Sequence, residues 1–147
     1  MKDVSIENLK IFVSKNQSYY IPIFQKISSL GGRFYASWNW AAFFFPQMWF
    51  FYRKMYLYGV IVLLASCVFN LIGWILSGII AGVAGNYLYF SHARNGILSL
   101  QETFPGETIS SKVALLGGTN SIIAWAAVII TVVLLMIPVL FIPFYRP

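Results

Sequence analysis

The 147-residue sequence has few of the side chains on which most enzymatic and metal sites depend. It contains one cysteine, one histidine and only four acidic residues. The single Cys67 cannot form a disulfide framework, and no cluster of His, Cys or carboxylate residues has the spacing of a metal site. All four acids also lie outside the apolar runs described below. We therefore predict a chain without catalytic residues, metal or cofactor.

Charge is also scarce, because only 10% of the residues are charged, against about 25% in a soluble domain. Residues 55–91 and 113–145 contain no Asp, Glu, Lys or Arg. Each run exceeds the ~20 apolar residues that cross a bilayer core, so an integral membrane protein is predicted. The net charge of +6 indicates membrane topology and attraction to anionic lipids. Nucleic-acid binding is not expected, since basic residues cluster only in pairs.

The predicted spans contain no acid, Lys, Arg or His. An ionisable residue inside a span is the usual mark of a proton relay or an ion pathway. Its absence argues against an ion-coupled transporter, although a pore lined by backbone groups stays open. His92 is interpreted as an interfacial aromatic residue and Cys67 as a small packing residue.

Residues 1–33 are predicted to form a cytoplasmic amphipathic segment. Ser18 could cap a helix that extends to Leu30 and ends at the glycine pair 31–32. Its apolar residues recur at helical spacing. They are Tyr20, Ile23, Phe24, Ile27 and Leu30. This face could pack on the protein itself at the membrane surface, or it could bind lipid.

An aromatic stretch follows, in which 13 of the residues 34–58 are Phe, Tyr or Trp, out of 27 in the chain. Its apolar part, residues 38–52, is too short for an ordinary span, and basic residues flank both sides. We predict that residues 34–56 form a re-entrant or interfacial segment. Asn39 could cap the helix that follows, and Trp49 could make a cation–π contact with Arg53. The residues predicted to anchor this segment at the headgroups are Trp38, Asn39, Trp40, Trp49, Arg53 and Lys54.

Residues 57–90 would measure about 51 Å as one straight helix, well beyond a ~30 Å core. One strongly tilted helix is possible, but a short transmembrane hairpin that turns near residues 70–73 is preferred. The hairpin keeps nine of the ten Lys and Arg residues on the cytoplasmic side. Small residues recur in its second half and predict close helix packing, within the chain or with a partner. They are Gly73, Ser77, Gly78, Ala81, Gly82 and Gly85.

Polar character returns in residues 91–120, which are predicted to be a cytoplasmic loop with a short surface helix and a turn at the Pro-Gly pair 105–106. Asn120 or Ser121 could cap the last predicted span, residues 121–144. Pro138 and Pro143 are expected to kink or end it. Arg146 would then be the only basic residue outside.

The run SWNWAAFFF at residues 37–45, with Trp49 and the YRKMY run at 52–56, resembles the signature of a bacterial inner-membrane family of unknown function. The segments around Tyr20 and Tyr89 are similar to the flanking parts of that family, so the resemblance covers roughly residues 10–98. It implies a location in the bacterial cytoplasmic membrane. It brings no catalytic residue and no cofactor.

Together these patterns predict a single all-α membrane domain with a cytoplasmic N-terminus. It comprises an amphipathic N-terminal helix, an aromatic re-entrant or interfacial helix, a hairpin and a C-terminal transmembrane helix. A non-enzymatic accessory, assembly or regulatory subunit of a larger membrane complex is the first hypothesis. A pore or transport component, which could be a homo-oligomer, and a lipid-binding, membrane-remodelling protein are the alternatives. The expected partners are anionic lipids and other membrane subunits.

Overall fold

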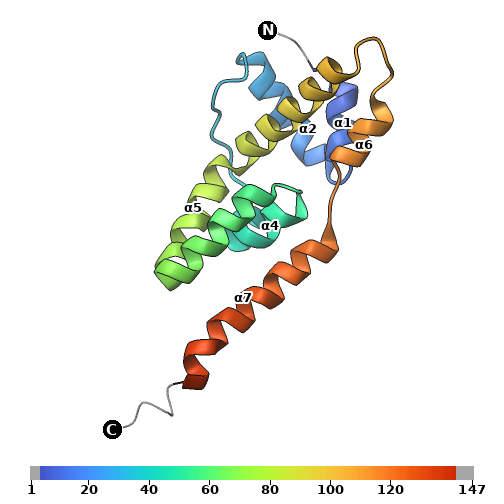
Figure 1. Ribbon diagram of the computed structural model, residues 1–147. Coiled ribbons are helices and arrows are strands. Elements are labelled where there is room, and N and C mark those ends of the chain that lie inside the picture. The colour runs from blue at the N-terminus through green and yellow to red at the C-terminus, as the bar shows by residue number, and fades with distance from the viewer. Residues whose placement is uncertain (1–3, 142–147) are drawn as a thin grey trace.

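The computed structural model describes residues 4–141, which fold into helices and their connections (Figure 1). The helices are α1 (Ile6–Val13), α2 (Gln17–Ser29), α3 (Trp40–Phe44), α4 (Pro46–Tyr52), α5 (Tyr56–Thr103), α6 (Ser110–Leu116) and α7 (Ser121–Phe141). The predicted all-α class is confirmed. Within the described residues, the segments Leu71–Thr103 and Ser110–Leu134 are long and apolar enough to cross a membrane.

The N-terminal segment contains two helices where one was expected. α1 begins after Ser5, whose hydroxyl accepts a hydrogen bond from the amide of Asn8 at 3.2 Å. α2 begins at Gln17, so the predicted cap at Ser18 is wrong, and Asn16 occupies the N-cap position instead. Asn16 has a left-handed φ of 62°, which asparagine tolerates better than most residues and which turns the chain tightly between the helices.

α2 buries the side chains that its helical spacing selects. Tyr20, Phe24 and Ile27 are buried, whereas Leu30 lies beyond the end of the helix and is exposed. The glycine pair 31–32 has φ values of 71° and 74°, and this left-handed conformation ends the helix as predicted. Of the two interpretations of this face, packing on the protein's own core is confirmed.

The long helical element α5 is folded back on itself. A Cβ atom at Gly73 would overlap the carbonyl oxygen of Ala65, although residues eight apart in a straight helix are about 12 Å apart. α4 also touches both Gly59 and Gly85, which a straight helix would hold about 39 Å apart. The green start of α5 and its yellow-green continuation accordingly lie side by side in Figure 1. The chain therefore reverses within residues 65–73, as the hairpin requires.

The row of small residues on α5 packs inside the protein. A Cβ atom on Gly78 would lie 2.6 Å from the carbonyl oxygen of Phe43, and one on Gly82 would lie 3.3 Å from the ring of Trp38. Ala81 is buried, Gly85 faces α3 and α4, and Ser77 is half-buried. Of the two possibilities raised by the sequence, the intramolecular contact is the one observed, because α3 occupies this face.

The second limb of α5 continues well beyond residue 90. It remains helical to Thr103, so the prediction of a loop from residue 91 is wrong for that stretch. Ala93 and Ile97 are fully buried there. The polar residues of this stretch suggested a loop, but its apolar residues form one helical face, which α1, α2 and α6 cover. The predicted turn follows, with Gly106 at a φ of 81°.

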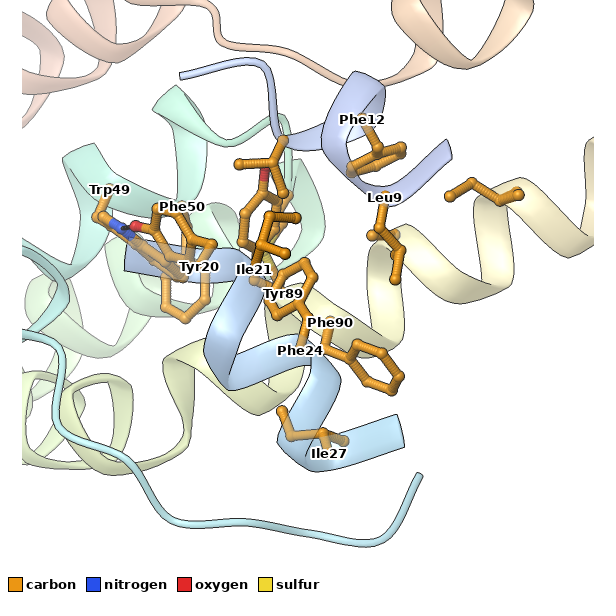
Figure 2. Packing of buried hydrophobic residues seen from close by; sticks show 14 of the residues in the cluster. Leu9, Phe12, Tyr20, Ile21, Phe24, Ile27, Trp49, Phe50, Tyr89 and Phe90 are labelled. Atoms are coloured by element: carbon orange, nitrogen blue, oxygen red, sulfur yellow. Dashed lines mark hydrogen bonds between the residues drawn. The ribbon is translucent and has the colours of Figure 1, made fainter. Parts of the chain in front are cut away.

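The main core lies where α1 and α2 cross the second limb of α5. Figure 2 shows the ring of Tyr89 at its centre. The centroid of this ring lies 6.1 Å from Phe12, 5.2 Å from Tyr20, 5.5 Å from Phe24 and 6.0 Å from Trp49. Such tilted and edge-on ring contacts stabilise beyond the area that they bury. Three helices, α1, α2 and α4, therefore meet on one tyrosine of α5.

The last helix, α7, begins at its predicted cap. The side-chain oxygen of Asn120 accepts a hydrogen bond from the amide of Ile123 at 3.1 Å. The backbone amide of Asn120 donates to the carbonyl of Tyr52 at 2.9 Å, which places the start of α7 beside the end of α4. α7 continues to Phe141, past Pro138. Pro143 and Arg146 lie outside the described residues.

The two ends of the protein differ in polarity. The polar end comprises α1, α2, α6, the distal half of α5 and the connections between them. With the neighbouring residues 33, 53 and 54, it carries every charged side chain of the described residues. The apolar end comprises the fold-back of α5 and all of α7. The large apolar side chains exposed there by more than half are Leu57, Ile61, Leu64, Val68, Phe69, Leu71, Ile72, Leu76, Ile80, Ile122, Trp125, Ile129, Val132, Val133 and Met136.

Candidate functional site

The aromatic segment, residues 34–58, lies between the other elements of the fold. It enters in extended conformation, forms α3, and begins α4 at Pro46, which suits the first turn of a helix because it needs no amide donor. Its first half is exposed, with Trp38 at 40% and Trp40 at 63% of full accessibility. Trp49 is only 5% exposed. The segment is therefore half surface and half core.

Asn39 is the first of three buried polar side chains on this segment. Its side-chain oxygen accepts from the amide of Ala42 at 3.0 Å, which confirms the predicted cap of α3. Its Nδ2 donates to the side-chain oxygen of Asn86 on α5 at 2.8 Å. Asn39 is only 2% exposed, so its predicted place among the lipid headgroups is wrong. A buried amide needs these partners, and α5 supplies one of them.

Asn86 extends this polar network to α2. Its Nδ2 donates to the hydroxyls of Ser37 and Tyr19, each at 3.0 Å. The Tyr19 hydroxyl in turn donates to the carbonyl of Trp38 at 2.7 Å. Burial raises the pKa of Tyr19, so the phenol keeps the proton that this bond requires. The network joins α2, the aromatic segment and α5 at one point.

Gln47 is the second buried polar side chain, and it holds α7. Its Nε2 donates to the hydroxyl of Thr131 at 2.7 Å and to the carbonyl of Ala127 at 3.2 Å. Gln47 is 7% exposed, and an amide in such apolar surroundings is costly without partners. No role was predicted for the side chains of Gln47 and Asn86, although an amide within an apolar stretch is itself the signal.

Arg53 is the third buried polar side chain, and its position contradicts the sequence-based prediction most strongly. It was expected to extend toward lipid phosphates, but it is 2% exposed. Its guanidinium lies over the rings of Tyr20 at 4.4 Å and Tyr89 at 5.0 Å. It donates to the carbonyls of Val13 at 3.1 Å and Lys15 at 3.3 Å. The charge is thus balanced by π faces and by carbonyls at the C-terminal end of α1.

Trp49 was expected to stack on Arg53, but its observed partner is different. Its indole N–H donates to the hydroxyl of Tyr20 at 3.1 Å. The rings that receive the Arg53 cation come from α2, from α5 and, at 5.5 Å, from the adjacent Tyr52. Since Trp49 is buried, its assignment as an anchor at the headgroups is wrong.

The remaining predicted anchors stay near the surface. Trp38 and Trp40 are exposed, and their ring centroids lie 5.3 Å apart. Lys54 is half-buried, and its ammonium group donates to the carbonyl of Leu115 at 2.9 Å. Anchoring by Trp38, Trp40 and Lys54 stays a prediction.

The described residues hold little reactive chemistry. No group of three or more His, Cys, Asp or Glu side chains comes together among them. His92 packs edge-on against Phe12 at 5.7 Å, and Cys67 is exposed on the apolar end instead of packed in the interior. What the three buried polar side chains do is hold the fold together: Asn39 binds α5, Gln47 binds α7 and Arg53 binds α1.

An apolar cavity of about 440 Å³ lies beside Gln47, between α4, the fold-back of α5 and α7. Met48, Trp74 and Val128 are among its walls. A second apolar cavity of about 190 Å³ continues along α3 and α4 and shares Phe45 and Met48 with the first. We call the two together the apolar groove. Its size is that of a small-molecule or lipid site.

The Gln47–Thr131 contact can be tested by a double-mutant cycle. Gln47→Leu and Thr131→Val are each expected to lower the free energy of unfolding by about 1 kcal/mol, because the partner group loses its bond. The double variant should lose less than the sum, since neither polar group is then left behind. Unfolding in detergent, followed by circular dichroism, measures this. The exposed Ile130→Val is the control, and strictly additive effects would show that the contact contributes nothing.

No family model matches the chain, and comparisons with curated proteins and with solved structures also found no match.

Proposed function

We propose that this chain is a non-enzymatic integral membrane protein that serves as an accessory, assembly or regulatory subunit of a larger membrane complex. The observation that carries the proposal is the apolar end. Its surface is a continuous set of exposed large apolar side chains, whereas Gln47, Ser66 and Thr131 turn inward and find partners. Soluble monomers rarely expose apolar patches of this extent. The surroundings that suit such a surface are lipid tails and other membrane helices.

The contacts of α7 support a proposed depth in the membrane for each element. α7 starts level with Tyr52, while Leu71 and Trp74 of the fold-back line the same cavity as Val132. From Val132 the helix continues through nine more residues, or about 14 Å, to Phe141. In this proposal α7 alone crosses the bilayer. The hairpin of α5 enters the bilayer and returns to the same side without reaching the opposite surface. The predicted transmembrane hairpin thus becomes a re-entrant one in this proposal.

The distribution of charge supports one orientation in the membrane. The basic residues of the described chain lie at the polar end or beside it, and the positive-inside rule puts such an end in the cytoplasm. In this orientation α1, α2 and α6 form a cytoplasmic cap. A bacterial inner membrane is the location that the resemblance of the aromatic segment implies.

A role as a subunit, instead of a channel formed by this chain, is supported by which helix faces are covered and which are exposed. The Gly78 and Gly82 face, on which a homo-oligomeric pore could be built, is covered by Phe43 and Trp38 of the same chain. Val133 and Met136, in the far half of α7, are exposed instead. A helix face without a neighbour in its own chain can pack against a helix of another subunit.

The test is purification from native membranes. The chain should remain in the membrane after alkaline carbonate extraction, and a mild detergent should release it with one or more protein partners in fixed ratio, as quantified by mass spectrometry. Val133→Trp should reduce that ratio, because the larger ring would obstruct helix packing. Ile122→Trp, near the start of α7, is the matched control. A chain that purifies alone, or an unchanged ratio in both variants, would contradict the proposal.

A further inference from the structure

The apolar groove has the shape of a site for a chain-like ligand. Along α3 and α4 its walls include Ala41, Phe45, Met48 and Tyr52, which all line the smaller cavity. At its deep end it widens between α7 and the fold-back of α5, where Leu71 is a wall. The groove therefore extends from Tyr52, at the end of α4, to the fold-back of α5.

The interior of the groove has no free polar side chain that could bind water. The polar side chains in its wall already have partners: Gln47 bonds to Thr131, and the Ser66 hydroxyl donates to the carbonyl of Val62 at 2.9 Å. An apolar cavity without free polar groups stays dry. It is also open at the side, because Phe45 and Leu71 in its walls are more than 60% exposed. Hydrocarbon is the material that can enter from that side in a bilayer.

The end of the groove at Tyr52 is basic. Tyr52 forms part of its wall, and its carbonyl receives the amide of Asn120 at the start of α7. Lys54 follows two residues later, and its ammonium group lies on the carbonyl of Leu115, near the end of α6. No acidic side chain of the described residues belongs to α3, α4 or α7. A cation at the mouth of an apolar slot matches a molecule with an anionic head and a hydrocarbon tail.

We propose that the apolar groove binds one phospholipid, with an acyl chain along α4 and an anionic headgroup beside Lys54. This inference rests on the membrane placement proposed above. The lipid would fill the space between α4, α7 and the hairpin, and so would hold α7 against the rest of the fold. Its presence would couple the position of the spanning helix to the composition of the bilayer.

The experiment compares lipid retention in matched variants. The full chain is reconstituted in nanodiscs of equal phosphatidylglycerol and phosphatidylcholine, released in mild detergent and weighed by native mass spectrometry. Val128→Trp should lower the fraction of protein that carries a lipid by about tenfold, because the ring takes the place of several methylene groups. Ile129→Trp is the control, since Ile129 is 62% exposed and outside the groove wall. Lys54→Gln should retain a lipid but lose the preference for phosphatidylglycerol.

Each result separates the two proposals. If carbonate extracts the unmodified chain, the membrane placement fails. If the chain stays in the membrane but carries no lipid, or if Val128→Trp and Ile129→Trp retain lipid equally, the groove is not a lipid site and only this inference is overturned. A partner protein that is lost on Val128→Trp, with no lipid in the unmodified chain, would assign the groove to that protein instead.

Discussion

Replacing Arg53 by alanine is expected to lower the free energy of unfolding by about 3 kcal/mol and to release α1 from the fold. Arg53 is the largest side chain that is fully buried in the described structure. Its removal would leave a cavity between α1, α2, α4 and α5. It would also remove the donors that reach the carbonyls of Val13 and Lys15. These bonds are the polar link between the end of α1 and the aromatic segment.

The expected loss combines packing and polar contributions. The aliphatic stem of an arginine fills space like an apolar side chain, and core truncations of that size cost about 2–5 kcal/mol. The cation also interacts with the π faces of Tyr20 and Tyr89, which is worth about 1 kcal/mol or more when desolvated. Part of the cost is offset, because the variant no longer buries a charge. The loss of packing therefore makes the net change in the free energy of unfolding destabilising.

Two measurements check this expectation. Unfolding in detergent gives the global effect, and limited trypsin digestion reports on α1. Lys10 in α1 and Lys15 just after it are exposed, and both become cleavable once the helix detaches. Arg53→Met keeps much of the volume and should cost less than alanine. Lys54→Ala, which removes one hydrogen bond of a half-buried residue, should cost under about 1 kcal/mol. Unchanged digestion of α1 in Arg53→Ala would refute the role of Arg53 as its anchor.

Gly73→Ala is expected to destabilise the protein by about 1–3 kcal/mol, although the same change in a straight helix would stabilise it by up to about 1 kcal/mol. The reason is the fold-back of α5. A Cβ atom at Gly73 would overlap the carbonyl oxygen of Ala65 and would also meet the Cβ of Phe69 at 3.0 Å. Backbone atoms cannot move aside as a flexible side chain can, so the two limbs would have to separate.

Gly85→Ala provides the matched control in the same helix. A Cβ atom at Gly85 would lie 3.4 Å from the Cβ of Ala42 and 3.5 Å from the ring of Trp49, which are ordinary packing distances. This variant should therefore be neutral or slightly more stable. Thermal unfolding of both variants in one detergent measures this difference in stability. A stabilised Gly73→Ala variant would mean that α5 is straight, and the hairpin would then have to be abandoned.

Features that depend on neighbours in the sequence could be predicted from it. Asn39 and Asn120 cap the helices that follow them, because an amide side chain reaches an amide only three residues ahead. The glycine pair 31–32 ends α2, and the charge-free runs form long apolar helices. The burial of Tyr20, Phe24 and Ile27 also followed from local helical spacing.

Features that depend on distant partners could not be predicted in this way. The Arg-Lys pair 53–54 looks like a membrane-surface marker, yet the tertiary structure buries Arg53 and leaves Lys54 near the surface. The carbonyls that receive the guanidinium lie about 40 residues earlier, and Tyr89 lies 36 residues later. Thr131, which pairs with Gln47, is 84 residues away. No local pattern encodes such pairings.

The sequence by itself determined that this protein is helical, apolar over most of its length and poor in reactive side chains, because composition and periodicity carry that information. Only the tertiary structure decided what the aromatic segment does. Its tryptophans and basic residues suggested a wedge at the membrane surface, but half of the segment is core. The physical reason is that Asn39, Gln47 and Arg53 each need partners once buried, and each finds them on a different helix.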